Sequence, residues 1–180
     1  MIFIIFDLEA TCWKDTFVPH RQEVIEVGAY SVNSFGEFLD TFQKFVKPVK
    51  SPVLSSYCRS LTGIDQRDID KSARFDVVMD QMQDWVFHFE SEFVFCSWGK
   101  KDMSLLSADA KDLKLDLSWI THHIDLKEQY NEMKGNNKPL GLARSLEMEK
   151  IDFEGNAHRA LPDAFNLSKL FIKYLDHWRY

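Results

Sequence analysis

The stretch IIFDLEATCW, residues 4–13, passes from an apolar run to a pair of acids. Ile2 to Phe6 has the continuous apolar pattern of a strand that is buried on both faces. Asp7 and Glu9 follow before any glycine or proline marks a turn. Because residues i and i+2 of a strand lie on the same face, we expect both carboxylates to project together.

Two carboxylates held this close repel each other unless a cation neutralises them. Mg²⁺ and Mn²⁺ are hard ions that prefer oxygen ligands, so Asp7 and Glu9 form a candidate metal site. The alternative is that the strand ends here and that both acids are solvated. A motif this short matches by chance too often to decide between the two interpretations.

Length and composition indicate an ordinary globular protein. A chain of 180 residues, 45% of them hydrophobic and 28% charged, predicts one domain over residues 1–180. At this size the core needs no disulfide. The formal net charge of −6 argues against a broad electrostatic grip on nucleic acid. It does not exclude a narrow cleft where bound cations supply positive charge.

The cysteines and the apolar segments bear on the compartment. Cys12, Cys58 and Cys96 are odd in number and far apart, which indicates reduced thiols in a cytoplasmic protein and argues against a zinc site. No segment reaches the ~18 consecutive apolar residues of a membrane span. The apolar start lacks the basic leader of a signal peptide, so we expect no membrane partner.

Strands are predicted mainly in the first part of the chain. After residues 2–6 and a loop over residues 14–22, EVIEVGAYSV (23–32) is rich in β-branched residues. EFLDTFQKFVKP (37–48) then alternates Phe with polar residues until a proline stops it. The short NSFG connection favours an antiparallel hairpin, and the first strand is expected to pair with it.

The remainder is mostly helical, with one further strand, EFVFCSW (92–98). SPVLSSYCRSLTGI (51–64) predicts a short helical or turn segment, and apolar residues recur at helical spacing over residues 75–89. Further helices are predicted over residues 101–113, 124–133, 140–149 and 163–178. A meander of three strands followed by alternating strand and helix predicts an α/β fold, with a mixed sheet covered by helices.

Later segments supply further polar side chains at the ends of predicted elements. Asp102 lies just past the strand at 92–98, where sites collect in open α/β sheets, or it only caps the following helix. Pro162, which is tolerated only in the first turn of a helix, sets the start of the last helix near Leu161. His158 then lies on the preceding loop and Asp163 in the first turn, where it is a capping candidate too. His158 alone is more typical of a surface or packing residue. Together, Asp163 offers a metal ligand and His158 offers a group that can take a proton near neutral pH.

These residues, in this order and these settings, resemble the three motifs of the DnaQ-like DEDDh 3′–5′ exonucleases. The likeness spans nearly the whole chain and is closest to the Eri-type, KapD-like subgroup in EVIEVGAYSV, FVKPVKSPVLSSYCRSLTGIDQRDID and FEGNAHRALPDAFNL. The motif residues are Asp7, Glu9, Asp102, His158 and Asp163.

The resemblance implies an RNase H-like fold with a five-stranded mixed sheet flanked by helices. Two residues depart from the family pattern. Lys101 stands where related sequences often carry an aromatic, which leaves one wall of the pocket for the terminal base in question. Pro162 is unusual inside the last motif but fits the predicted start of the helix.

The resemblance also implies a two-metal site, with Mg²⁺ or Mn²⁺, for phosphodiester hydrolysis. In that scheme Asp7 bridges both ions, and Glu9 and Asp163 complete the site that activates water. Asp102 helps to hold the second ion, partly through water. His158 is the general base that accepts the proton of the attacking water.

Six residues are candidate contacts of the terminal nucleotide: Leu8, Ala10, Thr11, Tyr57, Trp98 and Arg159. The alternatives are that Leu8 is core and that Thr11 begins a turn. Tyr57 matches an aromatic that stacks on the last base, an interaction worth ~1–3 kcal/mol, or it belongs to the core. Trp98 is a packing candidate as well, and Arg159 contacts either phosphate or solvent.

The function implied is a 3′–5′ exonuclease that releases nucleoside 5′-monophosphates from single-stranded 3′ ends. RNA is favoured over DNA because of the Eri-type resemblance, although no residue settles the choice between them. Two alternatives remain. One is a binding or regulatory protein that keeps the fold with little catalysis, and the other is a phosphohydrolase acting on small nucleotides.

Overall fold

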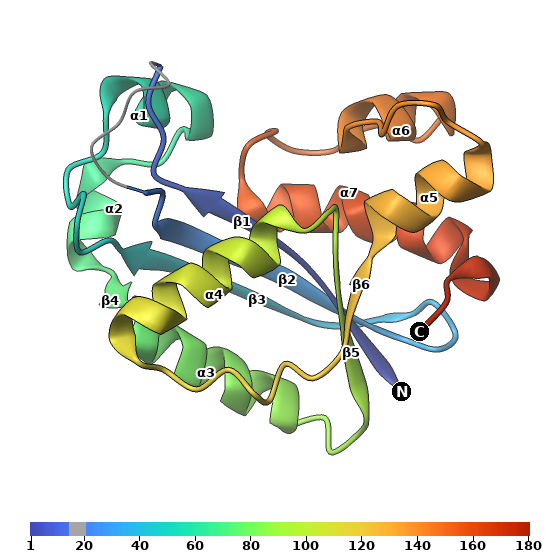
Figure 1. Ribbon diagram of the computed structural model, residues 1–180, viewed down its shortest axis with the longest axis horizontal. Helices are drawn as coiled ribbons and strands as arrows, with labels where there is room; N and C mark the ends of the chain where they lie inside the picture. Colours follow the sequence, from blue (N-terminus) through green and yellow to red (C-terminus); the bar gives the residue numbers. More distant parts are fainter. Residues whose placement is uncertain (15–20) are drawn as a thin grey trace.

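The computed structural model describes residues 1–14 and 21–180, so most of the loop expected over residues 14–22 lies outside the described residues. The elements are shown in Figure 1. In chain order they are β1 (Ile2–Ala10), β2 (Val24–Asn33), β3 (Phe38–Lys47), α1 (Ser56–Thr62), α2 (Gln66–Lys71), β4 (Ala73–Arg74), α3 (Phe75–Phe87), β5 (Phe93–Ser97), α4 (Lys101–Leu113), β6 (His123–Asp125), α5 (Leu126–Lys134), α6 (Leu142–Met148), α7 (Ala160–Lys173) and the 3₁₀ turn η1 (Leu175–His177).

The strands form one mixed sheet in the order β4-β3-β2-β1-β5-β6. β1, β2 and β3 pair antiparallel, which confirms the predicted meander, and β5 and β6 run parallel to β1. The predicted α/β fold with a mixed sheet is confirmed. The sheet has six strands where five were expected, because the two residues of β4 pair with the end of β3 at Val46 and Lys47.

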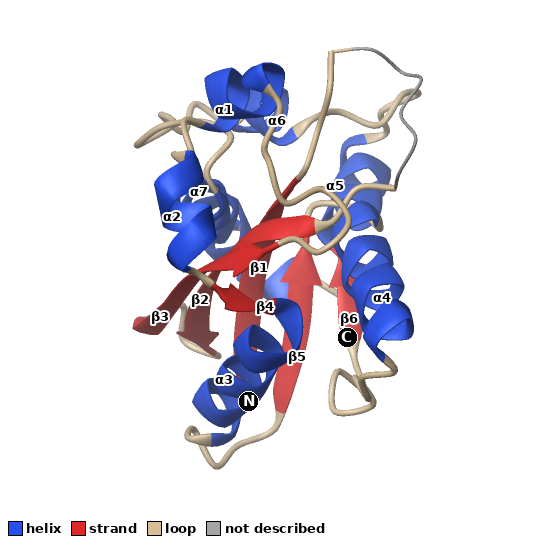
Figure 2. Ribbon diagram, turned by 90° about the vertical axis from the view of Figure 1, so that its left-hand side faces the viewer, coloured by secondary structure: helices blue, strands red, loops and turns tan. Residues whose placement is uncertain are grey.

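Side chains of β1 alternate between two cores on opposite faces of the sheet. Ile4 and Phe6 are fully buried in the core formed with α3 and α4, which lie on one side of the sheet in Figure 2. Phe3 and Ile5 are buried in the core formed with α5, α6 and α7. Burying each such side chain contributes roughly 1.5–3 kcal/mol, so the alternation fixes the register of β1.

A third, smaller core holds residues 48–72, which we call the α1–α2 segment. α1 begins at the N-cap Ser55, whose side chain accepts from the backbone of Cys58, and ends at Gly63 in a left-handed conformation. Asp65 caps α2 in the same way. The members of this core are Ile25, Leu54, Cys58, Ile64 and Ile69.

α7 begins near the end of β1 and runs along the sheet towards the start of β1, where Phe171 packs against Phe3 with ring centroids 4.8 Å apart (Figure 1). Its first residue is Ala160, so Pro162 lies in the first turn as predicted. The backbone of this first turn passes directly over Gly28 of β2, where no side chain would fit. α7 is thereby held close to the two central strands.

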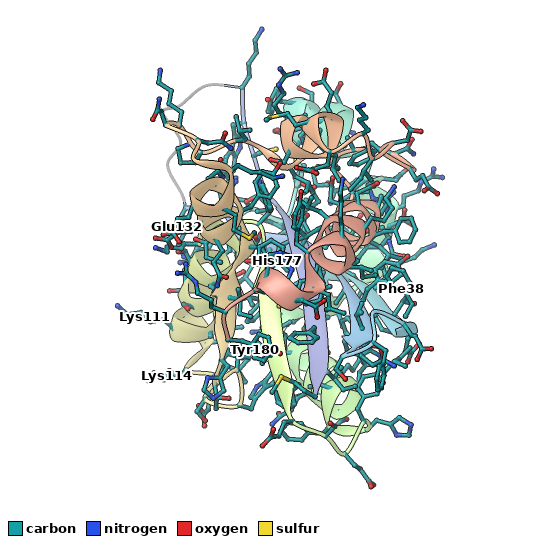
Figure 3. All side chains as sticks on the ribbon, turned by 90° about the vertical axis from the view of Figure 1, so that its right-hand side faces the viewer. Phe38, Lys111, Lys114, Glu132, His177 and Tyr180 are labelled. Carbon is teal, nitrogen blue, oxygen red and sulfur yellow. The ribbon has the colours of Figure 1, made fainter. Side chains whose placement is uncertain are left out.

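Figure 3 looks onto the face that α7 covers. On one flank Phe38 of β3 is partly exposed and packs against Tyr30 and Phe165, with ring centroids 5.3 and 5.7 Å away. On the other flank Glu132 of α5 pairs with Arg179 and ties the last residues of the chain to that helix. Among the described residues, no helix has the length and apolar character needed to cross a membrane.

Candidate active site

The two acids of the opening stretch lie within β1, because the strand continues to Ala10. Asp7 and Glu9 extend the odd-numbered row of side chains that faces α7. In the antiparallel register Asp7 lies opposite Gly28 and Glu9 opposite Glu26. The strand therefore continues past Phe6 with polar side chains on one face, and the predicted common direction of the two carboxylates follows from its period of two.

Asp163 joins these two acids from the first turn of α7. One carboxylate oxygen from each of Asp7, Glu9 and Asp163 lies within 4.8 Å of the others. Asp102, the second residue of α4, is 7% exposed, and its charge raises the pKa of Asp7. Residues from β1, α4 and α7 thus converge at one end of the sheet.

Burial and mutual repulsion raise the pKa values of the acids in the metal-free protein. Burial raises the pKa of Asp7 well above its ordinary value, and the charges of Asp102 and Asp163 raise it further. Burial, followed by the charges of Asp163 and Glu26, raises the pKa of Glu9 to about 8. Burial raises the pKa of Asp102 to about 7. Without a cation, the ionised form of these carboxylates is therefore energetically unfavourable.

This donor set fits divalent cations. None of the four acids makes an ion pair with any residue in ranges 1–14 and 21–180. All donors are carboxylate oxygens, the ligands that hard ions such as Mg²⁺ and Mn²⁺ prefer. Asp7, Glu9 and Asp163 are the residues that can hold such an ion, with Asp102 beside them.

His158 lies next to Asp163 on the loop before α7. It is exposed, and its φ of 62° is in the left-handed region that a non-glycine residue rarely adopts. Burial raises the pKa of Asp163, while the backbone N–H of Arg159 and both the charge and the backbone N–H of His158 lower it. The backbone nitrogen of Arg159 donates to Asp163 over 3.1 Å. An exposed histidine side chain thus lies beside the acidic cluster.

Lys101 is the exposed first residue of α4. Its charge lowers the pKa of both Glu9 and Asp102, against the larger effect of burial. The ammonium group therefore acts on the acidic cluster from the position where the family often has an aromatic ring.

The candidate substrate contacts on β1 are largely buried. Leu8 and Ala10 are each 7% exposed and belong to the core on the α3 and α4 side, which agrees with the packing alternative for Leu8. Thr11 is 2% exposed. Its backbone N–H donates to the carbonyl of Glu23 over 2.8 Å, and its hydroxyl accepts from the Glu23 nitrogen over 3.0 Å.

The other three candidates differ from one another. Tyr57 on α1 is 40% exposed and is not a core residue. Trp98 donates through its indole N–H to the carbonyl of Leu140 over 3.2 Å, which agrees with the packing alternative. Arg159 forms an ion pair with Glu26 at 2.9 Å. The sequence predicted only phosphate or solvent as the contact of Arg159.

Glu26 is one of two residues of β2 near the site that sequence reasoning did not single out. It is fully buried on β2 and accepts hydrogen bonds from Gln43, Arg159 and the backbone of Ala160. A signal was available, because an acid in the middle of the apolar run EVIEVGAY is unusual for a buried strand. Gly28, two residues further on, was overlooked as well.

The family model described as "Exonuclease" (RNase_T) matches residues 4–171. The chain therefore belongs to the exonuclease family, and the likenesses below place it with the Eri-like DEDDh 3′–5′ exonucleases. It is 33% identical to ERI1 exoribonuclease 2 of Xenopus laevis over 193 residues, covering 93% of this chain and 27% of that protein. It is 28% identical to 3′-5′ exoribonuclease 1 of Rattus norvegicus over 180 residues, covering 95% and 52%. The chain thus spans about a quarter to a half of these relatives.

Solved structures agree with this placement. The nuclease domain of 3′hExo, described as a DEDDh family member bound to rAMP, is 27% identical with a TM-score of 0.90, over 97% of this chain and 92% of that one. The 3′-exonuclease of a study on recognition of a histone mRNA stem-loop is 26% identical with a TM-score of 0.91, over 97% and 81%. The predicted RNase H-like exonuclease fold is confirmed.

Proposed function

We propose that this chain is a metal-dependent 3′–5′ exonuclease that removes nucleoside 5′-monophosphates from single-stranded 3′ ends, with RNA favoured over DNA. The observation that carries the proposal is the convergence of Asp7, Glu9 and Asp163 within 4.8 Å, beside Asp102. The four acids come from three elements, repel one another and have raised pKa values. Such a group is suited to hold cations, which would neutralise and orient a phosphodiester.

Each residue has a distinct task in this proposal. Asp7, Glu9 and Asp163 hold two ions of Mg²⁺ or Mn²⁺ together with Asp102. When bound, these ions supply water activation and stabilisation of the leaving 3′ oxygen. His158 accepts the proton of the attacking water, since its imidazole is exposed beside Asp163. The water oxygen bonds to phosphorus while the bond to the 3′ oxygen of the preceding nucleotide breaks.

The choice of RNA is supported by the relatives, whose names describe exoribonucleases. A net charge of −6 fits a site that grips only the last nucleotides and not a long polyanion. The exposed Tyr57 is the candidate for stacking on the terminal base. We also propose that residues 1–180 act as one domain and that the protein is cytoplasmic, since Cys12, Cys58 and Cys96 are free thiols.

The test uses a 5′-labelled single-stranded oligonucleotide, as RNA and as DNA, with Mg²⁺ or Mn²⁺ and with EDTA. We expect a ladder that shortens from the 3′ end, stops on chelation and is faster on RNA. Asp7→Asn and His158→Ala are expected to lose about 100-fold or more in turnover while remaining folded. His177→Ala changes an exposed histidine on η1 and serves as the matched control. Internal cuts, or cleavage unaffected by EDTA, would contradict the proposal.

The two alternatives give different results in the same assay. A binding or regulatory protein retains the oligonucleotide without shortening it under any metal condition. A small-nucleotide phosphohydrolase cleaves an ester of a nucleoside monophosphate and leaves the oligonucleotide intact. Comparing these two substrates at equal concentration therefore separates all three functions.

A further inference from the structure

The fully buried Glu26 and the partly exposed Arg159 form an ion pair beside the acidic cluster. Arg159 approaches with both arms of its guanidinium, Nε to Oε2 at 3.0 Å and Nη2 to Oε1 at 2.9 Å. Gln43 and the backbone of Ala160 complete the hydrogen bonding of the carboxylate at 2.7 and 3.1 Å. The Arg159 guanidinium also lies over the ring of Phe45, 5.4 Å from its centroid. Bidentate geometry and a second contact on the guanidinium leave Arg159 few alternative orientations.

This pair joins β2 to the backbone that carries the functional side chains. Arg159 follows His158 directly, and its backbone nitrogen donates to Asp163 over 3.1 Å. Ala160, the first residue of α7, donates to Glu26. One buried carboxylate therefore fixes both the side chain and the backbone of the turn between His158 and Asp163.

The backbone of this turn requires such support. His158 adopts a φ of 62°, a conformation that costs of order 1–3 kcal/mol in a residue with a side chain and persists only where surrounding contacts enforce it. The ion pair begins one residue later. Without it, the turn is free to relax towards an ordinary conformation, and the imidazole moves with it.

We propose that Glu26 and Arg159 are positioning residues, whose ion pair fixes the turn so that His158 and Asp163 reach the same reacting phosphate. The inference rests on the proposed exonuclease function. Neither residue touches substrate in this proposal; both act through His158 and Asp163.

Two other roles for the pair predict different results. If Arg159 only cancels the charge of Glu26, which lies opposite Glu9 and raises its pKa, then neutralising Glu26 makes Arg159 dispensable. If the pair only stabilises the fold, its loss lowers stability without a specific effect on turnover. The variants below separate positioning from both roles.

The experiment compares Arg159→Met, Arg159→Lys and the double variant Glu26→Gln with Arg159→Met. Positioning predicts that Arg159→Met lowers kcat by about 10- to 100-fold with KM within about threefold, because misplacement affects the chemical step more than binding. Arg159→Lys, which keeps the charge but loses the fork, is expected to restore only part of kcat. The double variant leaves no buried charge unpaired, so it should fold even if Arg159→Met does not, and its kcat is expected to stay low.

Lys134→Met is the matched control. Lys134, the last residue of α5, pairs with the largely buried Glu149 at 2.7 Å, and neither residue lies on an element that carries the four acids. It is expected to lower the melting temperature comparably and to leave kcat unchanged. Full kcat in the folded double variant, or in Arg159→Met with only a lowered melting temperature, would overturn the proposal.

A second readout keeps this inference separate from the proposed function. Mn²⁺ binding is measured by titration calorimetry on the same proteins, without substrate. Displacement of Asp163 predicts severalfold weaker binding in Arg159→Met and in the double variant, with no change in Lys134→Met. If the wild-type protein cleaves no substrate, the proposed function fails, yet the Mn²⁺ comparison still decides whether the pair positions Asp163. Equal Mn²⁺ affinity in all of these proteins would refute the positioning role.

Discussion

Gly28 of β2 lies in backbone contact with Leu161 of α7: a Cβ atom added to Gly28 would stand 2.2 Å from the Leu161 nitrogen. The same glycine is the antiparallel partner of Asp7. Asp163 follows Leu161 by two residues. The absence of a side chain at position 28 therefore sets how closely Asp163 approaches Asp7.

Gly28→Ala is expected to push the first turn of α7 away from the sheet. The added methyl meets backbone atoms that cannot move aside singly, so we expect a loss of about 1–3 kcal/mol or more in the free energy of unfolding. Turnover should fall with it, because Asp163 moves. Gly141→Ala is the control: no atom lies within 4 Å of a Cβ there, so only the loss of a favourable N-cap of α6, about 1 kcal/mol or less, is expected, with turnover unchanged. Urea denaturation of both variants, with the nuclease assay, checks this; equal stability would contradict it.

Divalent cations are expected to stabilise the protein through the acidic cluster. At a concentration of Mg²⁺ or Mn²⁺ about 100-fold above the dissociation constant, binding adds about 2.7 kcal/mol to the free energy of unfolding. Asp7→Asn should abolish most of this gain. It should also make the metal-free protein more stable than the wild type, because one of several mutually repelling carboxylates is removed. Thermal melts with metal and with EDTA measure both effects, and Asp176→Asn is the exposed control. Loss of metal-free stability in Asp7→Asn would count against the repulsion described here.

The buried carboxylate of Glu149 makes stability depend on pH. Burial raises the pKa of Glu149, but hydrogen bonds from Lys134, Lys173, Tyr174 and Tyr130 outweigh it and lower the pKa from 4.5 to about 2. A lowered pKa in the folded state contributes stability that is complete above about pH 4.5 and is lost as pH falls towards 2.

Glu149→Gln is therefore expected to lower the free energy of unfolding by up to about 3 kcal/mol at pH 7. The gap from the wild type should narrow progressively below pH 4.5. Denaturation at pH 7, 5 and 3 measures it, with Glu128→Gln, from an exposed pair with Lys100, as a control expected to change little. A gap that is independent of pH would show that Glu149 contributes by packing and not by charge.

Tyr57 is expected to contribute to the binding of the terminal nucleotide through its ring. Tyr57→Ala should weaken oligonucleotide binding by about 1–3 kcal/mol, whereas Tyr57→Phe keeps the stacking surface and should bind nearly normally. Phe35→Ala removes a ring that is 83% exposed near the β2–β3 turn and is the matched control. Fluorescence anisotropy with the inactive Asp7→Asn background gives the dissociation constants. Equal affinity of the Ala and Phe variants would exclude stacking by Tyr57.

The site residues that could be predicted from the sequence were those marked by a pattern in the residues next to them. Asp7 and Glu9 follow from the strand period, and Pro162 correctly placed Asp163 in the first turn of α7. The same period also predicts Leu8 on the core face, in line with Phe6, so its burial could have been derived.

What escaped prediction depends on contacts between distant segments. The partner of Glu26 comes from 133 residues further along the chain, and no local pattern indicates where α7 crosses β2. The role of Gly28 arises from the same crossing. β4 and β6 contain two and three residues, too few for any periodicity to mark them as strands.

The α1–α2 segment packs through a small core, to which β2 contributes the buried Ile25 and against which Phe45 of β3 and Cys12 also pack. The ring of Tyr57 is carried by this segment, whereas the acids are carried by β1, α4 and α7. We therefore expect that residues 48–72 can be exchanged as a unit, provided that Ser55 and Cys58, which donate to the carbonyls of Cys12 and Ala10, are kept. On the proposed function, such exchanges are expected to change which 3′ ends are accepted while the acids on β1, α4 and α7 stay in place.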